Sequence, residues 1–358
     1  IKHHYKDNFF KIFLFIVTLY FLLSLSPLTS ADTLDYHVGS ALNILRFDKY
    51  VLFPEWFTSL QSGTGETLIA LGLVIGAEQF GNIVQFSSVL TISGIFLKIH
   101  ENFKAFDSQF FLPITVLSCP ILLFLLSGNK PQIFYSSLLF FALALNFIKL
   151  ENEKEKLISY FIINILIFSC IVGKFSFNLS GFLIWTLSTL VIVNKKNFYK
   201  LILIVLVTFS LIYIPVILWK YINLGGSIFT YFFSPFPLHL PGYENFFSHN
   251  KGPQEIPFPY FLFYTTPSRF TEFLGLNALF FIIALYSIKK NPKINFLIII
   301  IFLYILVSNI YASPSARYYL DPILWSTFIV SISKPIKFKK LFQQVFLSQT
   351  FVIFLILI

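Results

Sequence analysis

The sequence contains little charge for its length. Only 12% of the 358 residues are charged, about half the share that soluble globular domains carry. Hydrophobic residues make up 56% of the chain, which leaves too little polar surface to cover a soluble fold. Together these two shares exclude a soluble protein with a large apolar core.

Cysteine is scarce and methionine is missing. The two cysteines, Cys119 and Cys170, lie inside apolar runs, where a thiol behaves as a small buried hydrophobe. A disulfide framework is therefore not indicated. The chain has no methionine, begins at Ile1 and ends inside an apolar run, residues 351–358. We therefore expect the sequence to be truncated at both ends.

Long apolar runs recur along the whole chain. Each has about 16 to 20 residues, which is enough for a helix to cross a bilayer. Basic residues gather in the short connections, and every strongly basic connection falls on one side, which the positive-inside rule assigns to the cytoplasm. The net charge of +10 therefore does not indicate nucleic acid. The sequence predicts an all-α, polytopic transmembrane helical bundle of about eleven spans, as a single domain over residues 1–358.

The direction of the first span follows from its flanks. Lys2, Lys6 and Lys11 precede the run at residues 12–28, so the N-terminus is expected in the cytoplasm. A cleaved signal peptide is the alternative for this run, although many further spans follow it. The other expected spans are residues 82–97, 110–126, 133–148, 157–172, 201–218, 270–288, 294–310 and 318–332, and the runs that follow residues 178 and 340.

The first outer loop, residues 29–66, carries a polar motif just beyond the first span. Residues 30–37 contain two carboxylates, a phenol and an imidazole. Residues 33–47 have a helical period, which predicts an amphipathic helix at the membrane interface. Its expected apolar face consists of Leu34, Val38, Ala41, Leu42 and Leu45, and its expected polar face of Asp32, Tyr36, Gly39, Ser40 and Asn43.

Two further segments depart from the simple alternation of spans and short loops. Residues 67–97 are apolar but too long for one span, and a polar interruption at residues 76–82 divides them. We expect a short membrane-dipping helix there, before the span at residues 82–97. The second outer loop, residues 219–267, is rich in Pro, Gly, His and aromatic residues and is too irregular to lie in hydrocarbon.

Four short motifs lie in order on the expected outer side of the chain. The first is Asp32-Thr33-Leu34-Asp35-Tyr36-His37 with the helix that follows it, and the second runs from Leu71-Gly72 to Gly81. The others are Gly173-Lys174, at the end of a span, and Arg317-Tyr318-Tyr319-Leu320-Asp321-Pro322, which opens a late span. This order resembles the GT-C superfamily of polytopic glycosyltransferases, with most likeness to bacterial protein-mannosyltransferase-like and aminoarabinose-transferase-like proteins.

The resemblance implies an enzyme that takes a sugar from a polyprenyl-phosphate-linked donor on the periplasmic face of a bacterial inner membrane. The sugar would go to a lipid, glycan or protein hydroxyl, and membrane lipids, but no nucleic acid, are the other expected partners. Such enzymes use an acid of the first outer loop as base, which here is Asp32. They often have a second acid in a following outer turn, whereas the turn at residues 128–132 contains Lys130 and no carboxylate. The lack of a glycine-rich phosphate loop also favours a lipid-linked donor over a nucleotide sugar.

Such a transfer needs a base for the acceptor hydroxyl and positive charge for the departing phosphate. Asp32 is the predicted base, and capping of the helix that follows it is the alternative, compatible role. The other candidate acids are Asp35, which also suits the dipole of the helix in whose first turn it lies, and Glu66.

Further polar residues are expected to bind the substrates. Tyr36 and Asn43 are predicted to hold sugar hydroxyls, with simple interface anchoring as the alternative. His37 is predicted to contact the donor phosphate when protonated. It is not expected to pair with Asp32, because the two point about 100° or more apart on an α-helical wheel.

Three cations are predicted to hold the phosphate. Arg317, with its bidentate fork and Tyr318 beside it, is favoured, followed by Lys174 and then Lys130. Snorkelling to the lipid headgroups is the alternative for each. No spacing typical of metal ligands is present, and a requirement for a divalent cation is left open. The residues expected to recognise the acceptor in the second outer loop are His239, His249 and Glu255.

Two other functions remain as alternatives. A polysaccharide polymerase or ligase would place paired arginines and a histidine in a late outer loop, where this chain offers Arg317. A transporter or lipid flippase would have inverted repeats and charged residues at mid-membrane, and the expected spans have neither feature.

Overall fold

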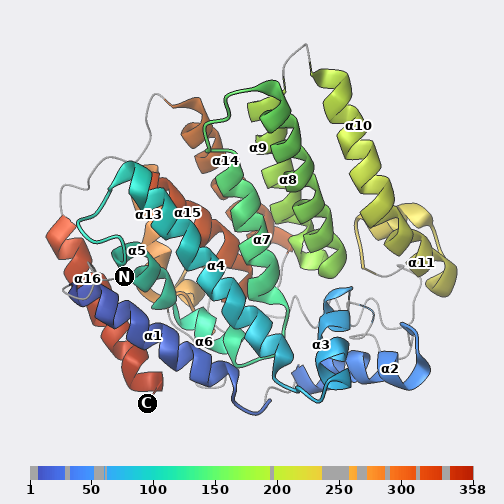
Figure 1. The fold of residues 1–358 in the computed structure, drawn as a ribbon, viewed down its shortest axis with the longest axis horizontal. Coiled ribbons are helices and arrows are strands. Elements are labelled where there is room, and N and C mark those ends of the chain that lie inside the picture. Colours follow the sequence, from blue (N-terminus) through green and yellow to red (C-terminus); the bar gives the residue numbers. More distant parts are fainter. Residues whose placement is uncertain are drawn as a thin grey trace. The chain divides into compact units, whose positions relative to one another are not determined.

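The computed structural model describes residues 7–28, 33–51, 60, 63–193, 197–235, 258–263, 272–286, 291–311, 315–332 and 339–357. Within these ranges the regular elements are helices and no strand is present, which confirms the predicted all-α membrane fold (Figure 1). Five stretches of the described chain are long and apolar enough to cross a membrane: Phe80–Phe103, Glu153–Gly173, Phe175–Ile192, Phe198–Leu224 and Pro292–Ile310. The count of about eleven spans stays a prediction.

The chain divides into two compact units. Unit 1 comprises Ile1–Pro27, Asn82–Gly128 and Gln254–Ile358, and unit 2 comprises Leu28–Gly81 and Asn129–Pro253. The helices of unit 1 are α1 (Asn8–Ser24), most of α4 (Phe80–Phe103), α5 (Phe111–Leu117), α6 (Pro120–Leu126), η6 (Tyr260–Leu262), η8 (Gly275–Ala278), α13 (Leu279–Leu285), α14 (Pro292–Tyr311), η9 (Ala316–Tyr319), α15 (Leu320–Ile332) and α16 (Lys339–Leu357). The helices of unit 2 are η1 (Thr33–Val38), α2 (Gly39–Phe47), α3 (Gly65–Val74), α7 (Gln132–Leu145), α8 (Glu153–Gly173), η3 (Phe175–Phe177), α9 (Asn178–Ile192), α10 (Phe198–Thr208), η4 (Phe209–Tyr213), α11 (Ile214–Leu224) and η5 (Ile228–Phe232).

The predicted span at residues 110–126 is two short helices, α5 and α6, in unit 1. α6 begins at Pro120, whose ring has no N–H to continue the helical ladder. The carbonyl oxygen of Ser118 at this break accepts a hydrogen bond from Nε2 of Gln349 at 2.7 Å, and the same amide donates to Oδ1 of Asn277 at 2.5 Å. A broken helix is tolerated at membrane depth when protein groups satisfy its backbone in this way.

The core of unit 1 is built around α15. All of its side chains from Leu320 to Ser331 are buried, and it packs against α5, α13 and α14. The ring of Trp325 meets that of Tyr304 edge to face, with the centroids 5.6 Å apart. A predominantly apolar helix without a polar face is expected to be buried in this way.

In unit 2, α8 is the central helix. It packs against α7, α9 and α10 (Figure 1, green). Small hydrogen-bonded pairs join neighbouring helices: Tyr160 and Thr189 hydroxyls lie 2.9 Å apart, and Nδ2 of Asn146 donates to Oγ of Ser188 at 2.9 Å. Such side chains contribute to the association of helices in a membrane, where the hydrophobic effect between helices is weak.

The interface helix predicted over residues 33–47 is present, but its first turn is wider than an α-helix. η1 is a π-helix, in which hydrogen bonds join residues five apart, and α2 continues from it. The predicted apolar face is divided. Val38 and Ala41 pack in a cluster with residues of α3, whereas Leu34 and Leu42 are exposed. α3 is the short helix that was predicted before the span at residues 82–97. The full-length helix α4 follows it, as predicted.

Candidate functional site

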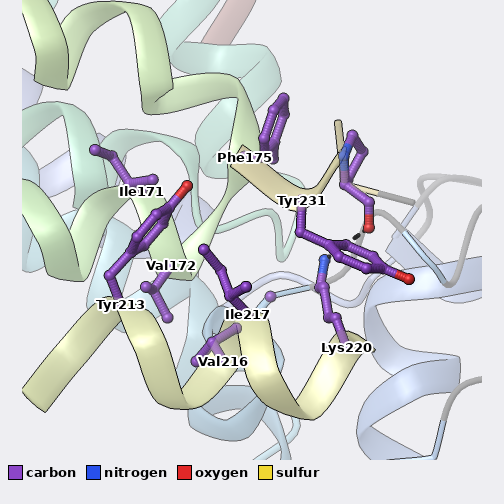
Figure 2. A pocket seen from close by; sticks show the side chains of 10 residues that line it. Ile171, Val172, Phe175, Tyr213, Val216, Ile217, Lys220 and Tyr231 are labelled. Carbon is purple, nitrogen blue, oxygen red and sulfur yellow. Dashed lines mark hydrogen bonds between the residues drawn. The ribbon is translucent and has the colours of Figure 1, made fainter. Parts of the chain in front are cut away.

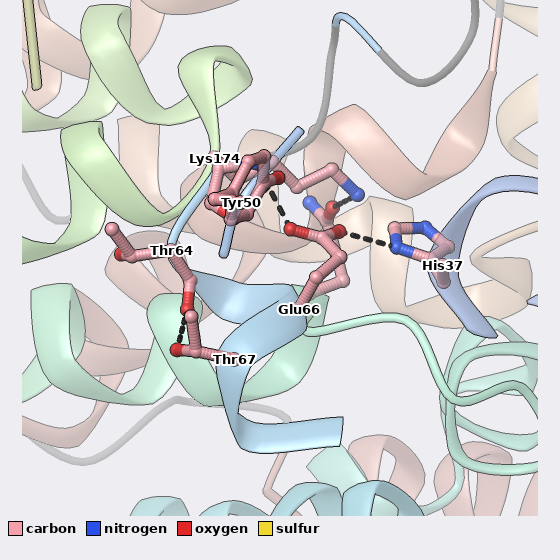
Figure 3. A network of polar contacts seen from close by, with 8 residues as sticks. His37, Tyr50, Thr64, Glu66, Thr67 and Lys174 are labelled. Carbon is pink, nitrogen blue, oxygen red and sulfur yellow. Dashed lines mark hydrogen bonds and ion pairs between the residues drawn. The ribbon is translucent and has the colours of Figure 1, made fainter. Parts of the chain in front are cut away.

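His37 and Glu66 meet in the interior of unit 2. Nδ1 of His37 lies 2.7 Å from Oε1 of Glu66, and the side chains are 1% and 2% exposed (Figure 3). The second carboxylate oxygen, Oε2, accepts a hydrogen bond from the backbone N–H of Gly63 at 2.9 Å. Both oxygens therefore have partners, as a buried carboxyl group requires. Both side chains are among the predicted site residues, but their pairing was not predicted.

Two glycines explain how the chain reaches this arrangement. A Cβ at Gly63 would lie 2.4 Å from the carbonyl oxygens of Val172 and Gly173. A Cβ at Gly173 would lie 2.0 Å from the ring of Tyr135. Glycine alone lets the segment before α3 and the end of α8 approach this closely. The approach places Glu66, in the first turn of α3, beside the start of α7 and the end of α8.

Two of the predicted phosphate-binding lysines belong to the same cluster. Lys130, just before α7, is 1% exposed. Lys174, just after α8, is partly buried, and its Nζ donates to Oε1 of Gln132 at 2.9 Å. Both ammonium groups lie within electrostatic reach of His37. The structure therefore brings together four predicted site residues that are far apart in sequence: His37, Glu66, Lys130 and Lys174.

Burial favours the neutral form of the His37 imidazole. Burial lowers the pKa of His37 from its ordinary value of 6.5, and the charges of Lys174 and Lys130 act in the same direction. The hydrogen bond and charge of Glu66 raise the pKa, but they do not outweigh burial. The predicted contact of protonated His37 with a phosphate stays a prediction, and the lowered pKa disfavours it.

A small pocket adjoins Gly63 in the same unit (Figure 2). Its charged group is Lys220, which is 9% exposed and donates from Nζ to the carbonyl oxygens of Pro235, at 3.1 Å, and Leu60, at 3.5 Å. The ammonium group is within electrostatic reach of Glu66. The other lining residues are Ile171, Val172, Phe175, Tyr213, Val216, Ile217, Tyr231 and Pro235.

Lys220 was missed because the expected span ended at residue 218 and the lysine fell into a loop. α11 continues to Leu224, so the lysine lies on a helix and is buried. The signal was available in the sequence, since Lys200 and Lys220 are the charged residues of the 27-residue apolar stretch Phe198–Leu224. A buried lysine in such a stretch is expected to have a structural or functional partner.

Of the other residues predicted in the first outer loop, one lies beside His37 and the rest are not shown to contact it. The ring of Tyr36 lies against that of His37, with the centroids 4.1 Å apart, so the structure brings it to the cluster. Asp35 is exposed on η1, and Asn43 is partly buried on α2. Four predicted residues lie outside the part of the chain that the structure describes: Asp32, His239, His249 and Glu255.

Arg317 and Tyr318 belong to unit 1, where they lie in η9 at the start of α15. The guanidinium carbon of Arg317 is 5.3 Å from the centre of the Tyr318 ring. Asp321, one turn later, is 4% exposed, and the hydroxyl of Ser315 donates to Glu272. Within the described ranges, no group of three or more His, Cys, Asp or Glu side chains is arranged to hold a metal ion.

The sequence decides the family of the chain. The family model for the DUF1420 N-terminal domain matches residues 2–358. The chain belongs to the DUF1420 family. No curated protein matches it in sequence.

Solved structures with a similar fold include ArnT from Cupriavidus metallidurans. The structure of ArnT bound to undecaprenyl phosphate matches with a TM-score of 0.60 and 12% identity, over 91% of this chain and 60% of the ArnT chain. The apo structure of ArnT matches with a TM-score of 0.61 and 12% identity, over 90% of this chain and 58% of the ArnT chain. This chain therefore spans about three fifths of the ArnT length. The predicted resemblance to aminoarabinose-transferase-like GT-C proteins is confirmed at the level of the fold.

Proposed function

We propose that the chain belongs to a membrane glycosyltransferase that uses a polyprenyl-phosphate-linked sugar donor. The sugar goes to a hydroxyl group of a lipid, glycan or protein on the outer face of a bacterial inner membrane. The observation that carries the proposal is the cluster of three lysines, two buried and one partly buried, around the His37–Glu66 pair in a fold shared with ArnT. That ArnT was solved with undecaprenyl phosphate supports a donor of the same class.

The charge of the cluster suits a phosphate leaving group. Lys130, Lys174 and Lys220 bring three ammonium groups into the surroundings of one carboxylate, Glu66. When the bond between the sugar carbon and the phosphate oxygen breaks, its electron pair goes to the phosphate, whose charge changes from −1 to −2. Fixed positive charge in a site shielded from water stabilises this change more than water does. Arg317, in unit 1, remains a proposed phosphate-binding residue.

The acceptor side of the reaction needs a group that takes the hydroxyl proton. We assign this role to Asp32, which the resemblance implies as base. Glu66 is less suited to it, because its two oxygens are engaged by His37 and by the N–H of Gly63. Tyr36 and Asn43 remain the proposed partners of sugar hydroxyls, and Asp35 is a secondary candidate acid. Membrane lipids and the polyprenyl chain surround the exposed apolar side chains of the helices.

The test is a transfer assay with the full-length membrane protein in lipid vesicles. Polyprenyl-phosphate-linked sugars are supplied, and the released polyprenyl phosphate is measured over time. We expect release by the wild type and about 100-fold less by the double variant Lys130→Gln/Lys174→Gln. The matched control is Lys98→Gln, which removes an exposed lysine that pairs with Glu101 at 2.6 Å. Release that is absent in the wild type, or unchanged in the double variant, contradicts the proposal.

A further inference from the structure

Among the described residues, one nitrogen of the His37 imidazole has a hydrogen-bond partner and the other has none. Nδ1 faces a carboxylate, so it carries the hydrogen and donates to Oε1 of Glu66. This fixes the tautomer and leaves a lone pair on Nε2. Nε2 is buried and has no hydrogen-bond partner among the described residues. A buried acceptor without a donor costs free energy, so a native structure that keeps one calls for an explanation.

The surroundings of His37 define which ligand group would satisfy Nε2. The titratable groups that face the ring are Glu66 from α3, Lys130 before α7 and Lys174 after α8. Tyr36 lies against the ring on η1 itself. Among the described residues, the charges that act on the ring besides that of Glu66 are those of the two lysines. α2, which also packs against η1, carries Arg46 at its far end, where it is exposed.

These surroundings exclude two classes of ligand group and favour a third. A phosphate oxygen offers no hydrogen to a lone pair, and it prefers the lysines. An ammonium group has hydrogens to donate, but two nearby lysines repel it. A hydroxyl group is neutral and donates one hydrogen to a nitrogen lone pair without loss of charge complementarity.

We propose that Nε2 of His37 accepts a hydrogen bond from a hydroxyl group of a substrate, and that Glu66 is the positioning residue that holds the ring for this contact. His37 is then a specificity-determining residue, which selects for a hydroxyl at one position of the donor sugar or of the acceptor. This inference rests on the proposed function, in which the hydroxyl proton of the reacting group goes elsewhere, to Asp32. It differs from the role predicted from sequence, because the phosphate is left to the cations and His37 contacts a hydroxyl group instead.

Two substitutions of His37 separate the contact with substrate from the contact with Glu66. The amide N–H of His37→Asn can replace Nδ1 as donor to Glu66, but nothing replaces Nε2. The longer His37→Gln places an amide oxygen where Nε2 lies, so an acceptor is retained. We expect Asn to raise one KM about 10-fold with little change in kcat, and Gln to restore most of that loss.

The two sources of the hydroxyl are distinguished by which KM changes. A rise in the KM of the polyprenyl-phosphate sugar assigns the contact to the donor, and a rise in the KM of the acceptor assigns it to the acceptor. Substrate analogues that lack one hydroxyl provide the second measurement. The analogue without the contacted hydroxyl should be discriminated against by the wild type and much less by His37→Asn. Because it compares substrates on the wild type, this measurement stands even if a variant folds poorly.

Three results would overturn the inference. If His37→Asn leaves both KM values within about twofold of the wild type, His37 only ties η1 to α3. If it lowers kcat and removes the acid limb of the pH profile at unchanged KM, His37 is the base itself. If the wild type shows no transfer from any polyprenyl-phosphate sugar, the proposed function fails and this inference fails with it. In the first case the proposed function stands, and in the second the glycosyl transfer stands but the base is His37 in place of Asp32.

Discussion

His37 and Glu66 are 29 residues apart in the chain, and their side chains meet at 2.7 Å inside unit 2. The pair joins η1, at the start of the first outer loop, to the first turn of α3, at its end. The polar motif after the first span is therefore closed into a site by a residue at the far end of the same loop. The consequences of this pairing can be measured in stability as well as in activity.

Glu66→Gln is expected to destabilise the protein by about 1–3 kcal/mol. Both oxygens of Glu66 accept hydrogen bonds, from His37 and from the N–H of Gly63, and an amide would direct its NH2 group toward one of these donors. Thermal unfolding in detergent measures the change. The control is Glu78→Gln, which removes an exposed carboxylate in the same unit and should be nearly neutral. Equal melting temperatures for the two variants would contradict the role assigned to the pair.

The stability of the protein is expected to fall in mildly acidic solution because of His37. The pKa of His37 is lowered in the native state, mainly by burial, while the unfolded chain has the ordinary value of 6.5. Between these two values the unfolded state binds more protons, so the free energy of unfolding rises with pH. The contribution of His37 to stability is therefore lost as the pH falls below about 6.5. Melting temperatures of the wild type and of His37→Asn, followed over this range, measure the effect. The variant should lose less stability on acidification, and parallel curves would refute the assignment.

Asp32→Asn is expected to reduce transfer from a polyprenyl-phosphate sugar by at least about 100-fold while leaving expression intact. The amide keeps the size of the side chain and its ability to cap a helix, but it cannot take a proton. The control is Asp48→Asn in the same loop, at a position with φ of 53°, a conformation that asparagine tolerates well. Full activity of Asp32→Asn would remove Asp32 from the mechanism and leave the other acids to be tested.

Gly173→Ala is expected to cost about 1–3 kcal/mol of stability and to reduce activity, because the added methyl group would lie 2.0 Å from the ring of Tyr135. The ring is held between helices and cannot move aside freely, so the end of α8 would have to shift away from Gly63. The control is Gly94→Ala in α4, where the added methyl group meets nothing within 4 Å. That substitution should stabilise by about 0.5–1 kcal/mol, since alanine favours helix more than glycine. A similar effect of both substitutions on the melting temperature would contradict the close packing described for Gly173.

Local features of the site were predictable from sequence, and its assembly was not. The order of apolar and polar segments places His37 and Glu66 at the two ends of one loop. It also places Lys130 and Lys174 in short connections between apolar runs. The pairing of His37 depended on two things that a helical wheel omits. The first turn of the helix is a π-helix, so the α-helical phase does not hold there. The partner also comes from another helix, which packs there because Gly63 permits it.

Hydrophobic content determined that this chain is an all-α membrane protein. A run of about 16 to 20 apolar residues can hydrogen-bond all its backbone groups within a bilayer only as a helix. The same reasoning located α3 before a full-length helix, because the polar break at residues 76–82 is a property of the local sequence. Tertiary structure decided which polar groups share an interior. The burial of Lys220, the break at Pro120 satisfied by Gln349, and the contact between His37 and Glu66 all join segments distant in sequence. Such contacts depend on how closely helices pack, and close packing is decided by steric fit between side chains that no single segment contains.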